Sequence, residues 1–105
     1  MKIFLDTAVF EDIHKFNQTG LIDGVTTNPS LILKSGGDPV ETIKKISGEF
    51  PFFESISAEV VADEALEMVN QAQAFKDMQN VTIKVPLTVE GLKACKLLSS
   101  DGFTV

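Results

Sequence analysis

One lysine lies inside an apolar run of the sequence, the segment VTIKVP at residues 81–86. Lys84 is flanked by Ile83 and Val85, and a lysine inside a strand that is buried on both faces is costly unless it is paired or deprotonated. Burial lowers the pKa of a lysine, and the neutral amine is a nucleophile toward carbonyl carbons. The ordinary alternative is a strand-end lysine whose ammonium group reaches water or forms an ion pair.

Other short apolar runs of the chain also carry polar residues: IFL (3–5) before Asp6, GVTT (24–27) with Thr26 and before Asn28, and SISAEVV (55–61) around Glu59. Side chains alternate along a strand, so these polar groups and Lys84 can all point to one face of a sheet. Parallel strands end at a common edge, where barrel enzymes and open α/β sheets place their active sites. The sequence therefore predicts a site at that edge.

Simpler interpretations exist for the acidic residues. Asp6 could begin a turn or cap a helix. A phosphatase of the haloacid-dehalogenase type would need a second aspartate at position 8, which is Ala8. A receiver domain would need an acidic pair after the first strand and an aspartate after the third, and neither is evident. For Glu59, the alternative is a structural ion pair with Lys84 on the next strand.

Each apolar run is followed by a segment with helical spacing. The expected N-caps are Thr7, Asp38 (with Pro39 at the first helical position), Asp63 and Thr88. The last helix is expected to direct an apolar stripe inward, formed by Val89, Leu92, Cys95 and Leu98. With a fifth strand at FTV (103–105), the pattern is βαβαβαβαβ, which predicts an α/β fold with a parallel sheet and right-handed crossovers.

Two architectures fit this pattern. One is a five-stranded doubly wound domain of the flavodoxin type that lacks its last helix. The other is the N-terminal half of a (β/α)₈ TIM barrel with strands in the order 1-2-3-4-5, since a whole barrel needs about 200 to 250 residues. On the second interpretation, residues 1–105 form one half-barrel that is truncated in the fifth strand, and the C-terminal half is absent.

Composition excludes several classes of protein. The chain has 105 residues, 44% hydrophobic and 23% charged, and a net charge of −6; all nine basic residues are lysines. An acidic chain without arginine is a poor match for a nucleic-acid phosphate backbone. One cysteine cannot form an internal disulfide, and no Cys/His cluster has metal-ligand spacing. The N-terminal apolar run is too short for a signal peptide or membrane span, so we expect a cytoplasmic protein without a membrane partner.

The sequence resembles the transaldolase family, and specifically its small subfamily, which includes the fructose-6-phosphate aldolases. The stretches that carry the resemblance occur in family order along the whole chain: IFLDTA (3–8), GVTTNPSLI (24–32), ISAEVV (56–61) and IKVPLTVEGLKA (83–94). The combination of TTNPS (26–30) with KVP (84–86), Thr88 and EGL (90–92) is very specific, whereas any one of these stretches alone is modest evidence.

The resemblance implies a (β/α)₈ barrel and class I aldol chemistry, which uses no metal or organic cofactor. Lys84 matches the Schiff-base lysine, Asp6 the acid/base carboxylate, and Glu59 the position that helps to hold a catalytic water. Thr26 and Asn28 match residues that contact the dihydroxyacetone moiety. The implied partners are sugar phosphate substrates and, for a full-length protein, further copies of the same chain.

Glu59 bears on the subclass, because transaldolases carry Glu at this position whereas the fructose-6-phosphate aldolases carry Gln. The resemblance therefore favours transfer of a dihydroxyacetone unit between sugar phosphates over simple aldol cleavage. The family's phosphate site lies on later strands and normally includes arginine, so we expect residues 1–105 to be inactive alone. A fructose-6-phosphate aldolase and a non-catalytic α/β binding domain remain the alternatives.

Overall fold

The structure is a computed structural model that describes residues 1–105. It contains four strands, five α-helices and one 3₁₀ helix, in the order β1 (Phe4–Asp6), α1 (Phe10–Asn17), β2 (Gly24–Thr26), α2 (Pro29–Ser35), α3 (Pro39–Glu49), β3 (Ser55–Glu59), α4 (Ala65–Ala72), η1 (Gln73–Phe75), β4 (Val81–Lys84) and α5 (Val89–Ser100). The alternation of strands and helices is the predicted one, and the α/β fold class is confirmed.

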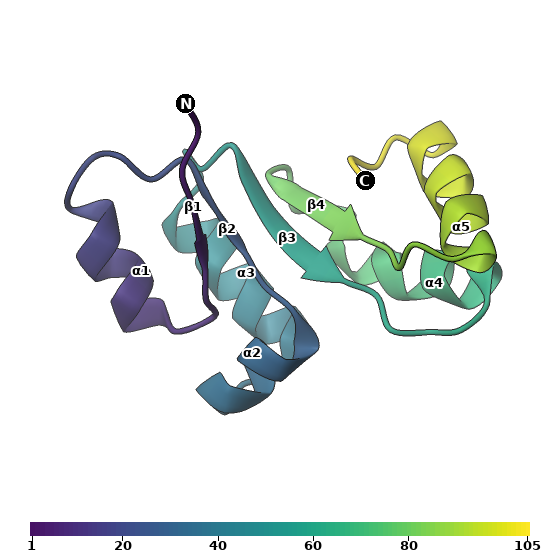
Figure 1. The fold of residues 1–105 in the computed structure, drawn as a ribbon, viewed down its shortest axis with the longest axis horizontal. Helices are drawn as coiled ribbons and strands as arrows, with labels where there is room; N and C mark the ends of the chain where they lie inside the picture. The colour runs from purple at the N-terminus through teal and green to yellow at the C-terminus, as the bar shows by residue number, and fades with distance from the viewer.

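The four strands form one parallel sheet in the order β1-β2-β3-β4 (Figure 1). A flavodoxin-like domain would have strand 1 between strands 2 and 3, so the sequential order excludes that alternative. Each strand is joined to the next by a helical crossover, as parallel neighbours require. This is the arrangement of the first half of a (β/α)₈ barrel.

The predicted fifth strand is present only as a single bridge. Thr104 pairs in parallel with Thr82 of β4, and the Ile83 amide donates to the Thr104 carbonyl at 2.8 Å. Because no second consecutive residue pairs, the prediction of a strand over 103–105 is wrong in its extent. The bridge nevertheless lies beside β4, so this segment occupies the fifth position of the order 1-2-3-4-5.

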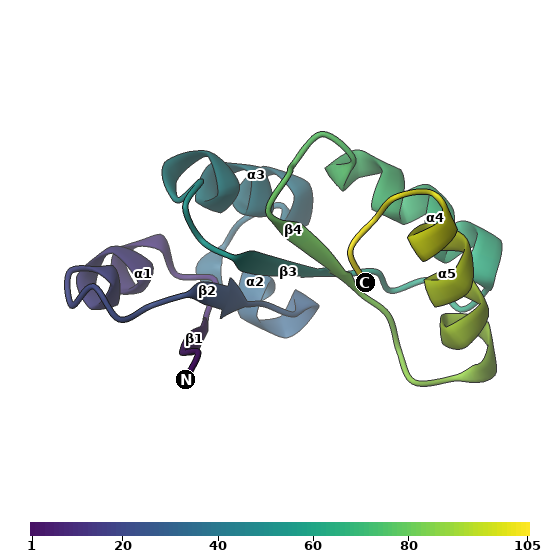
Figure 2. The same ribbon diagram turned by 90° about the horizontal axis from the view of Figure 1, so that it is seen from above.

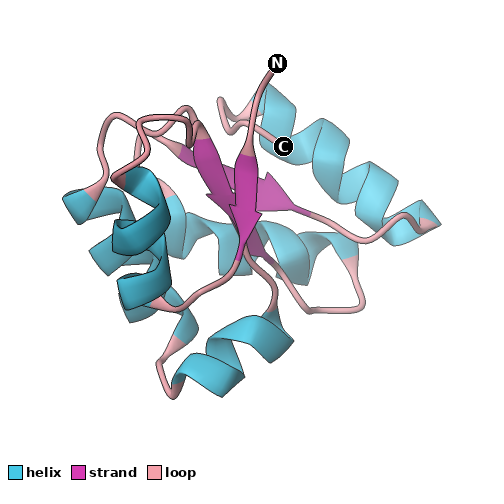
Figure 3. Ribbon diagram, turned by 60° about the vertical axis from the view of Figure 1, so that its left-hand side comes forward, coloured by secondary structure: helices cyan, strands magenta, loops and turns pink.

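The helices cover one face of the sheet and leave the other open. Seen from above, α1, α3 and α4 follow one side of the curved sheet, and α5 lies beyond β4 (Figure 2). In Figure 3 the strands lie at the centre of the view, with helices to their left, right and below. None of the helices is long and apolar enough to cross a membrane.

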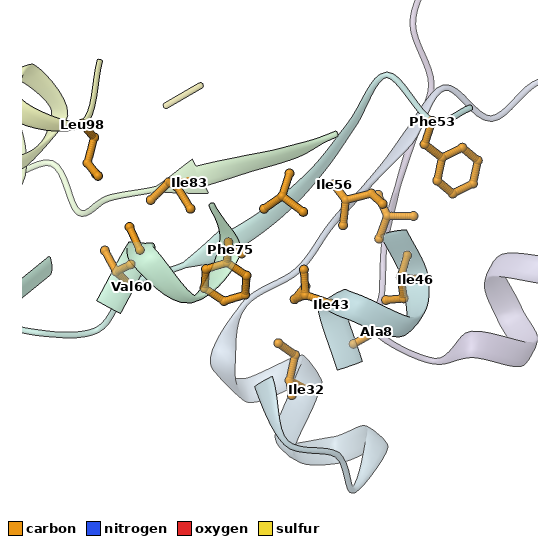
Figure 4. Packing of buried hydrophobic residues seen from close by; sticks show 14 of the residues in the cluster. Ala8, Ile32, Ile43, Ile46, Phe53, Ile56, Val60, Phe75, Ile83 and Leu98 are labelled. Atoms are coloured by element: carbon orange, nitrogen blue, oxygen red, sulfur yellow. The ribbon is translucent and has the colours of Figure 1, made fainter. Parts of the chain in front are cut away.

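The hydrophobic core lies between the sheet and its helices. Alternate strand residues point into it, including Val25, Ile56 and Ile83, which are at most 1% exposed. From the helices, Ile43 and Ile46 of α3 are equally buried. All five belong to a cluster of 19 buried hydrophobic residues. Figure 4 shows four of them, Ile43, Ile46, Ile56 and Ile83, among the packed side chains.

On the open face, Phe4 lies over β2 at Gly24. A Cβ atom at Gly24 would collide with the Phe4 ring and with the Ser55 carbonyl oxygen. The absence of a side chain at position 24 therefore lets β1 and β3 approach β2 closely. Phe4 remains 40% exposed, because no layer of the chain faces it.

Two of the four predicted helix caps are confirmed. The Asp38 carboxylate accepts from the Glu41 amide at 3.1 Å, and the Thr88 hydroxyl accepts from the Gly91 amide at 3.0 Å. Such caps satisfy amide groups that have no partner within the helix.

The other two predicted caps are wrong. The residue before α1 is Val9, and Thr7 instead accepts a hydrogen bond from the Val9 amide at 3.1 Å. The residue before α4 is Glu64, whose side chain makes no capping bond. The Ala65 amide donates at 3.3 Å to a carboxylate from α5, that of Glu90. A neighbouring helix thus supplies the cap that the sequence assigned to Asp63.

Candidate active site

All four strands end in a polar residue at the same edge of the sheet. These final residues are Asp6, Thr26, Glu59 and Lys84. The register places Asp6 opposite Thr26 and Glu59 opposite Lys84. The structure therefore assembles the predicted residues as two pairs, one on β1–β2 and the other on β3–β4.

The first pair is joined by a hydrogen bond. The Thr26 hydroxyl donates to the Asp6 carboxylate at 2.9 Å, and the ladder continues past it through the Thr7 amide, which donates to the Thr26 carbonyl at 3.1 Å. Asp6 is exposed and Thr26 is half-buried. The carboxylate is thus oriented by one donor and keeps acceptor capacity for a second.

The second pair is an ion pair. Lys84 Nζ lies 3.4 Å from Glu59 Oε2, and the two side chains are 47% and 27% exposed. The expectation that Lys84 is buried is therefore wrong. Its parity directs it to the open face, where no layer of the chain covers it. The structure realises the ion pair that was the alternative interpretation, and it also leaves the amine accessible to a ligand.

An open groove runs along the concave face of the sheet and brings three of the predicted residues together. Its lining comes from all four strands, the residue after β4, α5 and the C-terminal segment: Phe4, Asp6, Thr26, Ser55, Ser57, Thr82, Ile83, Lys84, Val85, Cys95 and Val105. Glu59 instead borders a neighbouring hollow with residues of the loops that follow β3 and β4. The Lys84–Glu59 ion pair connects the two concavities.

Asn28 lies two residues beyond the end of β2 and caps α2. Its Oδ1 accepts from the Leu31 amide at 3.0 Å, and Pro29 occupies the first helical position. The Nδ2 group makes no hydrogen bond within the chain and stays available as a donor. Like Glu59, Asn28 does not line the groove, so the groove brings together only three of the five predicted residues.

The sequence interpretation missed two buried polar residues, Thr27 and Ser57. They are 0% and 8% exposed. The Thr27 amide donates to Ser57 Oγ at 2.8 Å, and the Thr27 hydroxyl donates to the Ser57 carbonyl at 2.7 Å. The available signal for this contact was a hydroxyl residue in each of two neighbouring apolar runs. A single threonine or serine in a strand does not require a hydrogen-bond partner on the next strand, so the signal did not predict the contact.

The motif that follows β4 has a local structural explanation. Besides the Thr88 cap, it includes Gly91, where a Cβ atom would collide with the Pro86 carbonyl oxygen. Glycine at this position lets α5 begin directly against the end of β4. The loop that carries Lys84 into α5 is thereby held short and close to the sheet.

No group of three or more His, Cys, Asp or Glu side chains is arranged to hold a metal ion. The chemistry available at the sheet edge is that of one amine, two carboxylates and several hydroxyl groups. Barrel enzymes act at the carboxyl ends of their strands. This parallel α/β half-barrel carries an amine and carboxylates at that edge, so it has the layout of this class of enzymes.

Comparison with known proteins specifies the family. The model of the family described as Transaldolase/Fructose-6-phosphate aldolase matches residues 3–105. The chain belongs to this family. Its motifs IFLDTA, GVTTNPSLI, ISAEVV and IKVPLTVEGLKA all fall within the matched range, so the resemblance drawn from them is confirmed.

Curated relatives agree with this assignment. The chain is 54% identical over 105 residues to a "Probable transaldolase" of Sinorhizobium medicae, covering 97% of this chain and 46% of that protein. It is 51% identical over 106 residues to a "Probable transaldolase" of Brucella anthropi, covering 100% of this chain and 48% of that protein. The chain thus spans about half the length of the curated relatives it matches, at their N-terminal part.

Proposed function

We propose that these residues are the N-terminal half of a transaldolase, which transfers a dihydroxyacetone unit between sugar phosphates through a Schiff base on Lys84. The observation that carries the proposal is the ending of all four strands in Asp6, Thr26, Glu59 and Lys84 at one edge of the sheet. The amine and both carboxylates stand where a barrel enzyme places its reactive groups.

The reaction begins at the amine. Lys84 Nζ attacks the C2 carbonyl of a ketose phosphate, and loss of water leaves an iminium ion. The amine must be neutral for this step, and the Glu59 carboxylate at 3.4 Å is placed to accept the proton that the ammonium group loses. Through a bound water, the same carboxylate can return a proton to the departing hydroxyl group.

Carbon–carbon cleavage is assigned to Asp6. Its carboxylate takes the proton of the C4 hydroxyl group, the C3–C4 bond breaks, and the electron pair moves into the iminium to give an enamine. An aldose phosphate is released, and the enamine then attacks the aldehyde of a second aldose phosphate, whose oxygen takes the proton back from Asp6. Water then hydrolyses the resulting iminium, which releases the new ketose phosphate and restores the Lys84 amine. Thr26 holds the carboxylate at 2.9 Å, and we assign contacts with the dihydroxyacetone oxygens to Thr26 and Asn28.

The test is borohydride reduction in the presence of fructose 6-phosphate, followed by peptide mass mapping. Because the chain spans about half of its relatives, the principal sample is a completed chain, in which residues 1–105 are continued by the C-terminal part of the Sinorhizobium medicae relative. We expect one reduced adduct, on the peptide that contains Lys84. An adduct on a different lysine, or none, would overturn the proposal.

The 105-residue chain alone is expected to behave differently. The outer edge of β1 is unpaired, that of β4 is paired only through Thr104, and the concave face is uncovered; such surfaces favour association. We expect concentration-dependent sedimentation and no transaldolase turnover, with both reversed in the completed chain. A monodisperse monomer that turns over fructose 6-phosphate would show that residues 1–105 suffice.

Dependence on an acceptor separates the two activities of the family. A transaldolase consumes fructose 6-phosphate quickly only when an aldose phosphate acceptor is present, whereas an aldolase releases free dihydroxyacetone without one. Glu59 favours the first outcome. Release of dihydroxyacetone at the same rate with and without acceptor would assign the aldolase activity instead.

A further inference from the structure

The pairing of β2 with β3, which joins the two halves of the candidate site, differs from the strand pairing within each half. β1 pairs with β2 up to their last residues, Asp6 and Thr26, and β3 pairs with β4 up to Glu59 and Lys84. β2 and β3, in contrast, are in register only through Gly24 with Ser55 and Val25 with Ile56. Regular pairing across the centre of the sheet therefore stops before the site is reached.

Thr27 and Ser57 bridge this gap. The Thr27 amide donates to Ser57 Oγ at 2.8 Å, the Thr27 hydroxyl donates to the Ser57 carbonyl at 2.7 Å, and Ser57 Oγ also approaches the Thr27 carbonyl at 3.4 Å. These bonds replace the missing ladder with contacts made by side chains. Both residues are buried, although Ser57 also lines the open groove.

We propose that Thr27 and Ser57 are positioning residues that fix the separation between the Asp6–Thr26 pair and the Lys84–Glu59 pair. The proposal rests on the proposed function, in which the Asp6 carboxylate must meet a substrate held covalently on Lys84. Thr27 directly follows Thr26, and Ser57 lies two residues before Glu59. A shift between Thr27 and Ser57 therefore displaces the carboxylate relative to the amine.

The two chemical steps depend on this bridge to different extents. Formation of the iminium uses Lys84 and Glu59, which lie together on β3–β4. Cleavage additionally requires Asp6, which lies across the bridge on β1. Loss of the bridge should spare the first step and slow the second, whereas general destabilisation would affect both in proportion.

The experiment compares Ser57→Ala and Thr27→Val with the unchanged completed chain. We expect the borohydride adduct on Lys84 to form at an unchanged rate, while kcat for cleavage falls about 10- to 100-fold, the range expected for misplacement of a catalytic group by roughly 1 Å. Ser57→Thr and Thr27→Ser keep the hydroxyl groups and should restore most of kcat.

Ser47→Ala is the matched control. It also removes a side-chain hydrogen bond of a half-buried serine, the one to Asn80 Oδ1 at 2.6 Å, but it lies on α3, away from the open face. It should leave kcat unchanged. Amide hydrogen exchange gives an independent measurement, in which exchange at Thr27 should accelerate in Ser57→Ala without any substrate.

The outcomes separate the two proposals. Equal cleavage rates in Ser57→Ala, Thr27→Val and the unchanged chain would overturn the positioning role and leave the proposed function standing. A parallel loss of adduct formation and cleavage would also overturn it, because the two residues would then serve stability alone. Failure of the unchanged completed chain to form the adduct would overturn the proposed function, and the positioning role with it.

Discussion

The two faces of the sheet contrast in what their side chains do. On the helix-covered face, residues such as Val25, Ile56 and Ile83 are almost completely buried and make apolar contacts. On the open face, the strand ends carry hydrogen-bonded or ion-paired polar groups, and Lys84 remains 47% exposed. Folding energy and candidate chemistry are thus separated by strand parity. Substitutions on the open face should therefore reduce activity with little effect on stability, whereas substitutions on the covered face should reduce stability with little effect on activity.

The largest expected effect is on the open face. In the completed chain, Lys84→Met should abolish borohydride trapping. Unfolding free energy should change by less than about 1 kcal/mol, because an exposed ion pair contributes little to stability. Mass mapping and denaturant unfolding provide the two measurements, with Lys93→Met as the control. Trapping that persists in Lys84→Met would place the Schiff base elsewhere.

The covered face should show the reverse signature. Ile56 is 0% exposed, and Ile56→Ala should lower the unfolding free energy by about 2–5 kcal/mol through lost burial and a residual cavity. Trapping per folded molecule should be unchanged. The neighbouring Ser55→Ala, on the opposite face of the same strand, should cost about 1 kcal/mol through loss of its hydrogen bond to Thr82. Equal losses for the two variants would contradict the separation of the faces.

A smaller effect is expected at a helix start away from both faces. Asp38→Ala removes the acceptor of the Glu41 amide and should cost about 0.5–2 kcal/mol in unfolding free energy. Asp38→Asn retains an acceptor and should recover most of that loss. Urea unfolding of the completed chain distinguishes the variants, and an unaffected Asp38→Ala would show that water replaces the cap.

The smallest effect is a pH dependence at Glu90. A hydrogen bond from Lys93 and a second from the Ala65 amide lower the pKa of this carboxyl below its ordinary value of 4.5. A lowered folded-state pKa stabilises the protein above the unfolded pKa, and this stabilisation is lost as pH falls through the folded value. We expect Glu90→Gln to have a lower Tm at neutral pH and no deficit at strongly acidic pH. A constant deficit would exclude titration of Glu90 as its cause.

Much of the site's layout could be predicted from the sequence, because strand parity is a strict geometric rule. Parity placed Asp6, Thr26, Glu59 and Lys84 on one face. It could not predict the exposure of Lys84, since exposure depends on what covers that face. It also gave no sign of the Thr27–Ser57 contact, which depends on where the pairing of β2 with β3 stops.

The inward stripe predicted for α5 was only partly correct. Leu98 is buried, but Val89 and Leu92 are 70% and 58% exposed. The buried face is instead formed by Gly91 and Ala94 together with Leu98, and α5 packs mainly against α4. At Gly91 the small residue lets the helix lie close to the Pro86 carbonyl oxygen, and this packing overrides the preference of larger apolar residues for burial. A pattern that counts only hydrophobicity does not register such close contacts.

The capping role of Asn28 has a consequence for what that corner of the molecule can recognise. Because Oδ1 accepts from the Leu31 amide, the orientation of the side-chain amide is fixed, and the NH₂ group is the end without a partner in the chain. A ligand atom that meets this NH₂ group must be an acceptor. A hydroxyl or carbonyl oxygen satisfies that polarity, whereas a protonated amine does not, so a helix cap becomes a filter on the chemistry of the ligand.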